Sequence, residues 1–168
     1  MTVREQSDSD PGNRAANWNQ PMFHRVLDAH PITVRATLQD VRRRFSFDLS
    51  EDTLGRLELV LAEVMNNITE HAAAPKQGAK LSLPSIHLSI VRHNTGLACA
   101  LTDDGTSLPA ACLQPRNLPS MITEDLPEGG FGWFLIQDLT QSLCYYREEN
   151  RNYLAFKIPF ASTAKLAP

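Results

Sequence analysis

The strongest hydrophobic pattern of the chain lies between positions 57 and 68. Its apolar side chains recur at steps of three and four residues, so on a period of about 3.6 residues they form one stripe along a helix. They are Leu57, Val60, Leu61, Val64 and Ile68. Ser50 precedes the pattern as an N-cap residue, and Pro75 and Gly78 follow it. A long helix that begins after Ser50, ends near Ala73 and packs on a core is therefore predicted.

One flank of this helix carries three polar side chains, Glu63, Asn67 and His71, at steps of four residues. Because each residue advances the helix by about 100°, the three lie one above another at the border between the apolar stripe and solvent. A carboxylate, a carboxamide and an imidazole in a row suit ligand contacts, whereas a solvated face favours Lys, Arg and Glu in salt-bridge order. The flank is the first candidate for chemistry, with a solvated flank as the alternative.

Alternation with a period of two predicts strands elsewhere in the chain, and helical spacing predicts two more helices. The elements are a strand at 22–29, a helix at 31–47, strands at 86–91 and 97–102, a short helix at 131–139, and strands at 143–147 and 153–158. Asn94 and Gly96 favour a tight reversal, and a second hairpin turns at 148–151. The predicted fold class is α+β, a two-layer sandwich in which a mainly antiparallel, mixed β-sheet is covered on one face by about three helices.

Length and composition fit one globular domain of a 168-residue chain that is 42% hydrophobic and 21% charged. We expect this domain to occupy residues 21–160, between disordered tails at 1–20 and 161–168. A net charge of −3 and a pI of about 5.9 argue against direct nucleic-acid binding. No segment has the length and hydrophobicity of a membrane span or a signal peptide, so a cytoplasmic protein without membrane contact is expected.

The cysteines and arginines of the sequence do not by themselves indicate a metal or catalytic site. Cys99, Cys112 and Cys144 lack metal-type spacing, and the first and last lie in apolar strand-like runs, which predicts buried, reduced thiols. The helix at 31–47 carries four arginines that either form a solvated face or meet an acidic partner. They are Arg35, Arg42, Arg43 and Arg44.

Two glycine-containing motifs stand at the ends of predicted elements. Thr102-Asp103-Asp104-Gly105 closes an apolar strand, where a carboxylate leaves the sheet and Gly allows close approach by another molecule. Gly129-Gly130-Phe131-Gly132 opens a helix, an arrangement that presents free N–H groups to phosphate. Alone, the first is a common turn and the second a common site of tight packing. Their conjunction with Glu63 and Asn67 in one small domain favours a ligand site.

These motifs together resemble those of the Bergerat-type, or histidine-kinase-like (GHKL), ATPases. Glu63-x-x-x-Asn67 is similar to the N box of that superfamily, Asp103-x-Gly105 to its G1 box, and Gly130-x-Gly132 to its G2 box. Within the superfamily, the run Glu128 to Ile136, followed by a hairpin with Arg151-Asn152-Tyr153-Leu154, resembles the small anti-sigma factor serine/threonine protein kinases. The resemblance covers about Phe23 to Pro159.

The resemblance implies a site for ATP and Mg²⁺. Asn67 would give a carboxamide oxygen to Mg²⁺, and Glu63 would be the general base for an attacking serine hydroxyl. Asp103 would accept a hydrogen bond from the adenine amino group, with Gly105 leaving room for the ring. Gly129, Gly130 and Gly132 would bring N–H groups to the phosphates, and the Pro-rich segment between positions 103 and 128 would act as a lid.

Other positions depart from the family pattern or keep an open role. Ser107 stands where the G1 box often has a second Gly, and Glu128 precedes the G2 glycines where some relatives have an Arg, a role that falls to Arg116 or to no residue. Trp133, assigned to the nucleotide site, is expected to pack under the lid. His71 either contacts the ligand, packs on the core or bonds the lid.

Three functional hypotheses follow. The leading one is an anti-sigma factor and ATP-dependent serine kinase that sequesters a sigma factor, phosphorylates an anti-anti-sigma (STAS-type) antagonist and so regulates transcription in a stress response by partner switching. The second is a nucleotide-gated binding module without turnover, which would not need Glu63. The third is the catalytic domain of a histidine kinase, for which neither His24 nor His30 lies in a predicted two-helix hairpin. The resemblance also implies a possible homodimer.

Overall fold

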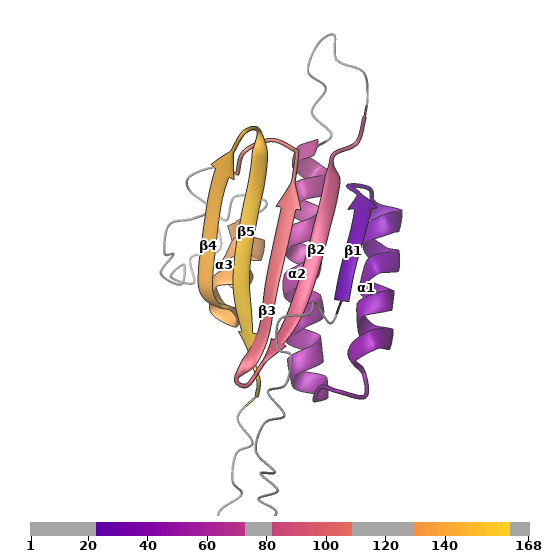
Figure 1. Cartoon of the computed structure of the whole chain (residues 1–168), viewed down its shortest axis with the longest axis vertical. Helices are drawn as coiled ribbons and strands as arrows, with labels where there is room; N and C mark the ends of the chain where they lie inside the picture. The colour runs from indigo at the N-terminus through magenta and orange to yellow at the C-terminus, as the bar shows by residue number, and fades with distance from the viewer. Residues whose placement is uncertain (1–22, 73–81, 109–129, 162–168) are drawn as a thin grey trace, which may run out of the picture.

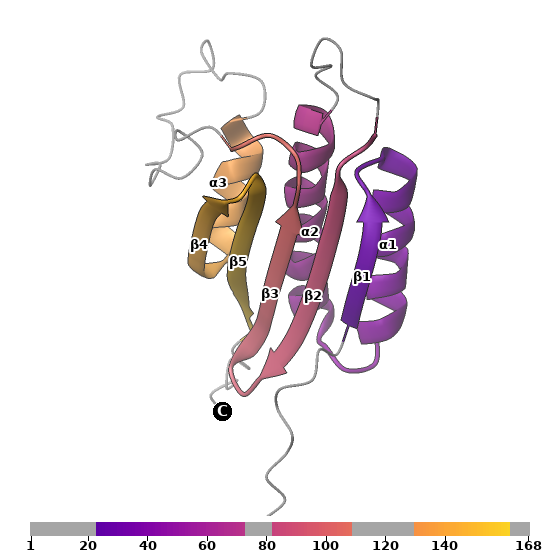
Figure 2. The same cartoon turned by 45° about the horizontal axis from the view of Figure 1, so that its top comes forward.

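The computed structural model describes residues 23–72, 82–108 and 130–161. Five strands form one sheet in the order β1-β2-β3-β5-β4, and every neighbouring pair is antiparallel. The strands are β1 (Phe23–Asp28), β2 (Ser85–His93), β3 (Gly96–Asp103), β4 (Gln141–Glu148) and β5 (Arg151–Pro159), and the helices are α1 (Pro31–Phe45), α2 (Glu51–Ala72) and α3 (Gly130–Leu139). Figures 1 and 2 show all three helices on the same face of the sheet. The predicted α+β two-layer fold is confirmed.

Helix α2 forms as its sequence pattern predicts. The side chains of Leu57, Val60 and Leu61 are fully buried, so the predicted stripe faces the core. Ser50 caps the helix, because its Oγ accepts a hydrogen bond from the Thr53 amide at 3.2 Å. This cap satisfies one of the free N–H groups of the first turn.

Helix α1 is shorter than predicted. It ends at Phe45 rather than at Phe47, and the amides of Asp48 and Leu49 both donate to the Phe45 carbonyl as the chain turns toward α2. The Phe45 side chain is fully buried, whereas Phe47 is 98% exposed. Phe45 is therefore the last core-facing aromatic of the helix. The predicted end was two residues too late because the apolar but exposed Phe47 was counted as part of the helical pattern.

Three of the four arginines of α1, Arg42, Arg43 and Arg44, form ion pairs within the same molecule, whereas Arg35 is exposed. Arg42 donates to both carboxylate oxygens of Glu58 on α2, at 2.8 and 2.7 Å. Arg43 pairs with Asp40, and Arg44 with Asp48. These contacts join α1 to α2 and to the turn after α1.

The two cysteines that the structure describes differ in environment. Cys99 is buried on β3, and burial raises the pKa of its thiol to about 12. Cys144 is exposed, so the prediction of a buried thiol is wrong at that position. Cys144 lies on β4, an edge strand in which side chains alternate between the helix-covered face and the open face. Cys112 lies outside the described residues.

The second hairpin turns where predicted. Glu149 and Asn150 connect β4 to β5 with φ of 46° and 64°, the left-handed pair that suits a two-residue hairpin loop. The predicted tails at 1–20 and 161–168 lie outside the described residues, except for Ala161. No helix in the described part of the chain is long and apolar enough to cross a membrane. The end of β3, the C-terminal half of α2 and the start of α3 lie at the same end of the sheet (Figure 2).

Candidate functional site

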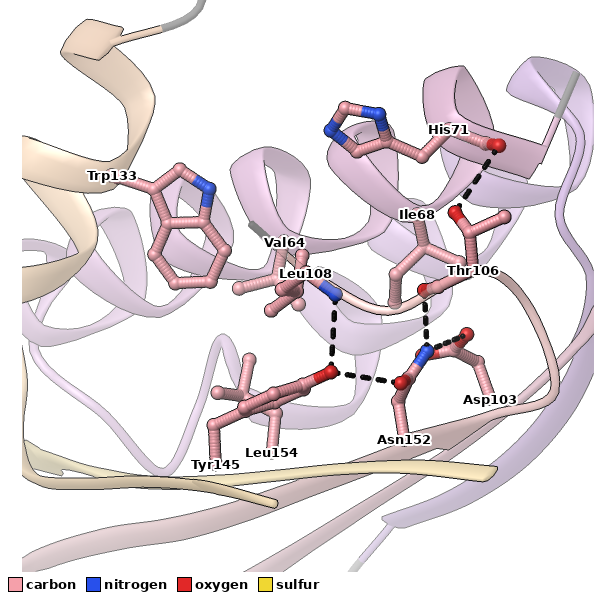
Figure 3. Close-up of a pocket in the computed structure, with 10 residues that line it drawn as sticks. All are labelled: Val64, Ile68, His71, Asp103, Thr106, Leu108, Trp133, Tyr145, Asn152 and Leu154. Carbon is pink, nitrogen blue, oxygen red and sulfur yellow. Dashed lines mark hydrogen bonds between the residues drawn. The ribbon is translucent and has the colours of Figure 1, made fainter. Parts of the chain in front are cut away.

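A pocket lies at that end, between α2, α3 and the strands (Figure 3). Its empty volume is about 380 Å³, solvent at its mouth included. It is lined by Val64, Ile68, His71, Asp103, Thr106, Leu108, Trp133, Tyr145, Asn152 and Leu154. The lining therefore combines an apolar wall from the helices with a polar edge from the strand ends.

The polar flank of α2 lies against the first turn of α3. A Cβ atom added to Gly132 would overlap Oε2 of Glu63 and would lie 4.0 Å from Nδ2 of Asn67. A larger residue at position 132 would have to displace the Glu63 carboxylate, which ends a flexible side chain. The structure thus brings together Glu63, Asn67 and Gly132, which are far apart in sequence.

Asn67 carries an unsatisfied polar atom. Its Nδ2 is buried, and it has no hydrogen-bond partner within the described part of the chain. A buried amide without a partner costs about 1–3 kcal/mol, which proteins tolerate mainly where a ligand or ion completes the site. Rotation of the carboxamide exchanges its nitrogen and oxygen, so the same position can offer an oxygen ligand to a cation.

Asp103 closes β3 as a buried carboxylate, 7% exposed. Its Oδ1 accepts hydrogen bonds from the Gly105 amide at 2.8 Å and from Asn152 Nδ2 at 2.9 Å. Burial raises the pKa of Asp103, and these two hydrogen bonds oppose the rise. A Cβ on Gly105 would lie 2.9 Å from the same Oδ1, so this turn requires glycine.

The neighbouring carboxylate of Asp104 has a structural contact. Its Oδ1 accepts a hydrogen bond from the Ser85 amide at 2.7 Å. That bond fixes the first residue of β2 beside the end of β3. The two acidic residues of the turn therefore differ in role, since Asp103 lines the pocket and Asp104 holds the strands in register.

Three side chains of the β4–β5 hairpin support Asp103, and sequence reasoning gave none of them a role. We call Tyr145, Arg147 and Asn152 the hairpin clamp. Oδ1 of Asn152 accepts from Tyr145 Oη at 2.9 Å and from Arg147 Nη1 at 2.7 Å, while its Nδ2 donates to Asp103 and, at 2.8 Å, to the Thr106 carbonyl. Sheet register makes this possible, because Asp103 pairs with Asn152 across β3 and β5, and Asn152 with Arg147 across β5 and β4.

The clamp also holds the segment that leaves β3. Arg147 Nη1 donates to the Gly105 carbonyl at 3.0 Å. The Leu108 amide donates to Tyr145 Oη at 3.1 Å (Figure 3). A sequence signal for Asn152 exists in hindsight. It shares the core-facing positions of β5 with Leu154, Phe156 and Ile158, where a polar residue needs a buried partner.

The remaining predicted site residues fall at the margins of the pocket. The His71 side chain is exposed and lines the pocket, and its carbonyl accepts a hydrogen bond from Thr106 Oγ1 at 3.4 Å. Trp133 is 3% exposed and forms both core and pocket wall. Gly130 begins α3. Gly129, Arg116 and most of the predicted lid lie outside the described residues.

Fold and pocket define the class of this protein, a two-layer α+β domain with a small-molecule pocket between its helices and the ends of its strands. The family described as histidine kinase-like ATPase domain matches residues 26–158. The chain belongs to this family, which implies ATP binding. A search of curated proteins finds no match to the sequence.

Two solved structures are similar in fold. One contains the RsbU and RsbW domains of Rv1364c from Mycobacterium tuberculosis, with a TM-score of 0.56 and 11% identity; the match covers 87% of this chain and 34% of that one. The other is the histidine kinase domain of the Erythrobacter litoralis EL346 blue-light activated histidine kinase, with a TM-score of 0.46 and 16% identity over 89% of this chain and 65% of that one. This chain therefore spans less than two thirds of either, and the likeness concerns the fold alone.

The residues of the pocket and of the α2–α3 junction beside it fit ATP as the family implies. The close approach at Gly132, the start of α3 and the carboxamide of Asn67, whose Nδ2 has no partner among the described residues, suit phosphate and a hard cation. The buried acceptor at Asp103 and the apolar wall above it suit a base that carries a hydrogen-bond donor. The two halves of a nucleotide thus match the two ends of the site.

Proposed function

We propose that the chain is an ATP-dependent protein serine kinase and anti-sigma factor. It would sequester a sigma factor and would phosphorylate a serine of a STAS-type anti-anti-sigma antagonist, which lowers the affinity of that antagonist. The motif resemblance supports the choice of partners, and family membership supports the use of ATP.

The observation that carries the kinase half is the position of Glu63. It lies one helical turn before Asn67, and its carboxylate meets the first turn of α3 at Gly132. A module that only binds nucleotide needs Asn67, Asp103 and the glycines, but it has no use for a carboxylate beside the phosphates. A carboxylate there would repel phosphate unless it accepts a proton, so its presence favours a base.

Each residue then has one task. Bound ATP with Mg²⁺ would supply the phosphoryl group and the charge neutralisation on its oxygens. Asn67 would hold the metal, and the N–H groups at the start of α3 would hold phosphate oxygens. Glu63 would accept the proton of the incoming serine hydroxyl, and Asp103 would accept a hydrogen bond from the adenine amino group.

Phosphate transfer from ATP to a purified STAS-type antagonist tests this proposal. We expect the wild-type chain to transfer phosphate in the presence of Mg²⁺, and Glu63→Gln to lose at least about 100-fold in rate while it still binds ATP, since a positioned base contributes about 10²–10⁴-fold. Glu70→Gln is the matched control, because Glu70 is exposed on the same helix.

Two results would overturn parts of the proposal. Full transfer by Glu63→Gln would remove the role of Glu63 as the base. No transfer by the wild-type chain, with a sigma factor still bound in a pull-down, would remove the kinase half and leave a binding module.

A further inference from the structure

In the hairpin clamp, Asn152 has one hydrogen-bond partner that can only donate and one that can only accept. Arg147 is always protonated and only donates, and the Thr106 carbonyl only accepts. Asn152 contacts both, at 2.7 Å from Arg147 Nη1 and at 2.8 Å from the Thr106 oxygen. The carboxamide of Asn152 therefore has one orientation, with its oxygen toward Arg147 and its nitrogen toward Asp103.

This orientation sets the polarity of Asp103. Asn152 Nδ2 and the Gly105 amide both donate to Oδ1 of Asp103, so neither lone pair of that atom is free to hold a proton. These two donors favour the ionised carboxylate, and no hydrogen bond to Oδ2 is found among the described residues, so Oδ2 is the acceptor offered to a ligand. A ligand that meets Asp103 must then present a donor, such as an amino group, because a carbonyl oxygen would face a second acceptor.

We propose that Arg147, acting through Asn152, is a positioning residue that makes the pocket select a purine with a 6-amino group over one with a 6-carbonyl. Arg147 does not line the pocket, and its hydrogen bonds connect it to Asp103 through the carboxamide between them. Its positive charge also lowers the pKa of Asp103, an effect that Arg147→Lys keeps and Arg147→Met removes. The inference rests on the proposed nucleotide site, and it adds the reason why the base is adenine. If the Asn152 carboxamide rotated by 180°, its oxygen would face Asp103, and the site would no longer favour a ligand that presents a hydrogen-bond donor.

The test compares equilibrium binding of ATP and inosine triphosphate, which differ at the 6-position of the base, by titration calorimetry with Mg²⁺. A site that hydrogen-bonds a ligand donor rejects an analogue without it strongly, so we expect the wild-type chain to prefer ATP by at least about 100-fold. Arg147→Met removes the obligate donor, and we expect the preference to fall about tenfold or more. Arg147→Lys keeps a charged donor and should restore most of the preference.

Arg151→Met is the matched control on the same hairpin, because Arg151 is exposed at the first position of β5 and lies beside Glu148. It should leave the ratio of the two affinities unchanged. Asn152→Asp provides a second variant that places a second carboxylate beside Asp103, and the preference should also fall. Thermal unfolding of each variant identifies those that fail to fold.

The outcomes separate the two proposals. No binding of either nucleotide by the wild-type chain would overturn the proposed function. Tight binding of both nucleotides without preference would leave that function standing and would overturn the inference. An unchanged ratio in Arg147→Met, or an equal loss of both nucleotides in a folded Arg147→Met, would show that Arg147 has only a structural role and would also overturn it.

Discussion

The two ends of the candidate site differ in how their polar groups are hydrogen-bonded. The hairpin clamp lies at the pocket wall, whereas the junction of α2 and α3 lies beside the pocket. At the hairpin clamp, Asn152 makes four hydrogen bonds, and the segment that leaves β3 is tied to Tyr145 and Arg147. At the other end, where α2 meets α3, the Nδ2 of Asn67 is buried without a partner in the described residues, and Glu63 fills the space beside Gly132. Among the described residues, the first end is fully hydrogen-bonded, whereas the second keeps a buried polar atom without a partner.

The difference separates a rigid part of the site, at Asp103, from the part where we propose that the reaction takes place, at Asn67. A fully satisfied buried network fixes the orientation of its members, so the acceptor at Asp103 is preorganised. A buried polar group without a partner lowers the stability of the free protein, and a ligand that bonds to it removes that cost. Ligand binding should therefore stabilise the end at Asn67 most. The proposed base recognition therefore belongs to a rigid strand end, and the proposed phosphate chemistry belongs to the junction of two helices.

Alanine at each of the two asparagines gives the largest expected contrast. Asn152→Ala removes four hydrogen bonds and leaves buried partners unpaired, so we expect the free energy of unfolding to fall by about 3–5 kcal/mol. Asn67→Ala removes an atom without a partner, so we expect a change below about 1 kcal/mol together with loss of Mg²⁺-dependent ATP affinity. Urea unfolding and calorimetry measure the two effects. Equal destabilisation by both substitutions would break the comparison between the two ends.

Alanine at two glycines tests the helix junction. Gly132→Ala places a methyl group where Oε2 of Glu63 lies, so we expect a loss of about 1–2 kcal/mol in stability and displacement of the carboxylate. Gly55 is its matched control on α2, because a Cβ there meets nothing within 4 Å. Gly55→Ala should stabilise the chain by about 0.5–1 kcal/mol through helix propensity. A Gly132→Ala variant as stable as Gly55→Ala would show that the junction is loose.

The pH dependence of ATP affinity gives the smallest effect. Burial raises the pKa of Asp103, and the acceptor is lost on protonation, so ATP affinity should fall as the pH drops through the raised pKa. The stability term has the opposite sign. Because the folded state holds this proton more tightly than the unfolded state, ionisation of Asp103 lowers stability as the pH rises between the ordinary and the raised pKa.

Calorimetry across that range, repeated with Asp103→Asn, separates Asp103 from the other groups nearby. Asp104 and Arg147 act on its charge, and His71 lines the same pocket. The asparagine variant should bind ATP more weakly and without the pH step. A step that persists in Asp103→Asn would assign the titration to another group.

Several features of this protein could be predicted from its sequence because they depend on local periodicity. The stripe of α2 is buried as the spacing of its apolar residues requires, and Glu63 and Asn67 share a flank because four residues make about one helical turn. Both hairpins turn where Asn and Gly, or two residues with positive φ, allow it. The spacing of such patterns fixes the elements and their outward faces, and hence the α+β class.

Only the tertiary structure decided what meets Asp103. The order β3-β5-β4 aligns Asp103, Asn152 and Arg147 in one row across three strands. The spacing of residues along the chain does not predict this alignment. The same holds for Cys144, whose apolar run gave no sign that it lies on the open face of an edge strand. Side-chain direction within an element follows from its period, whereas the partner of a side chain follows from strand order and register, which depend on contacts far apart in sequence.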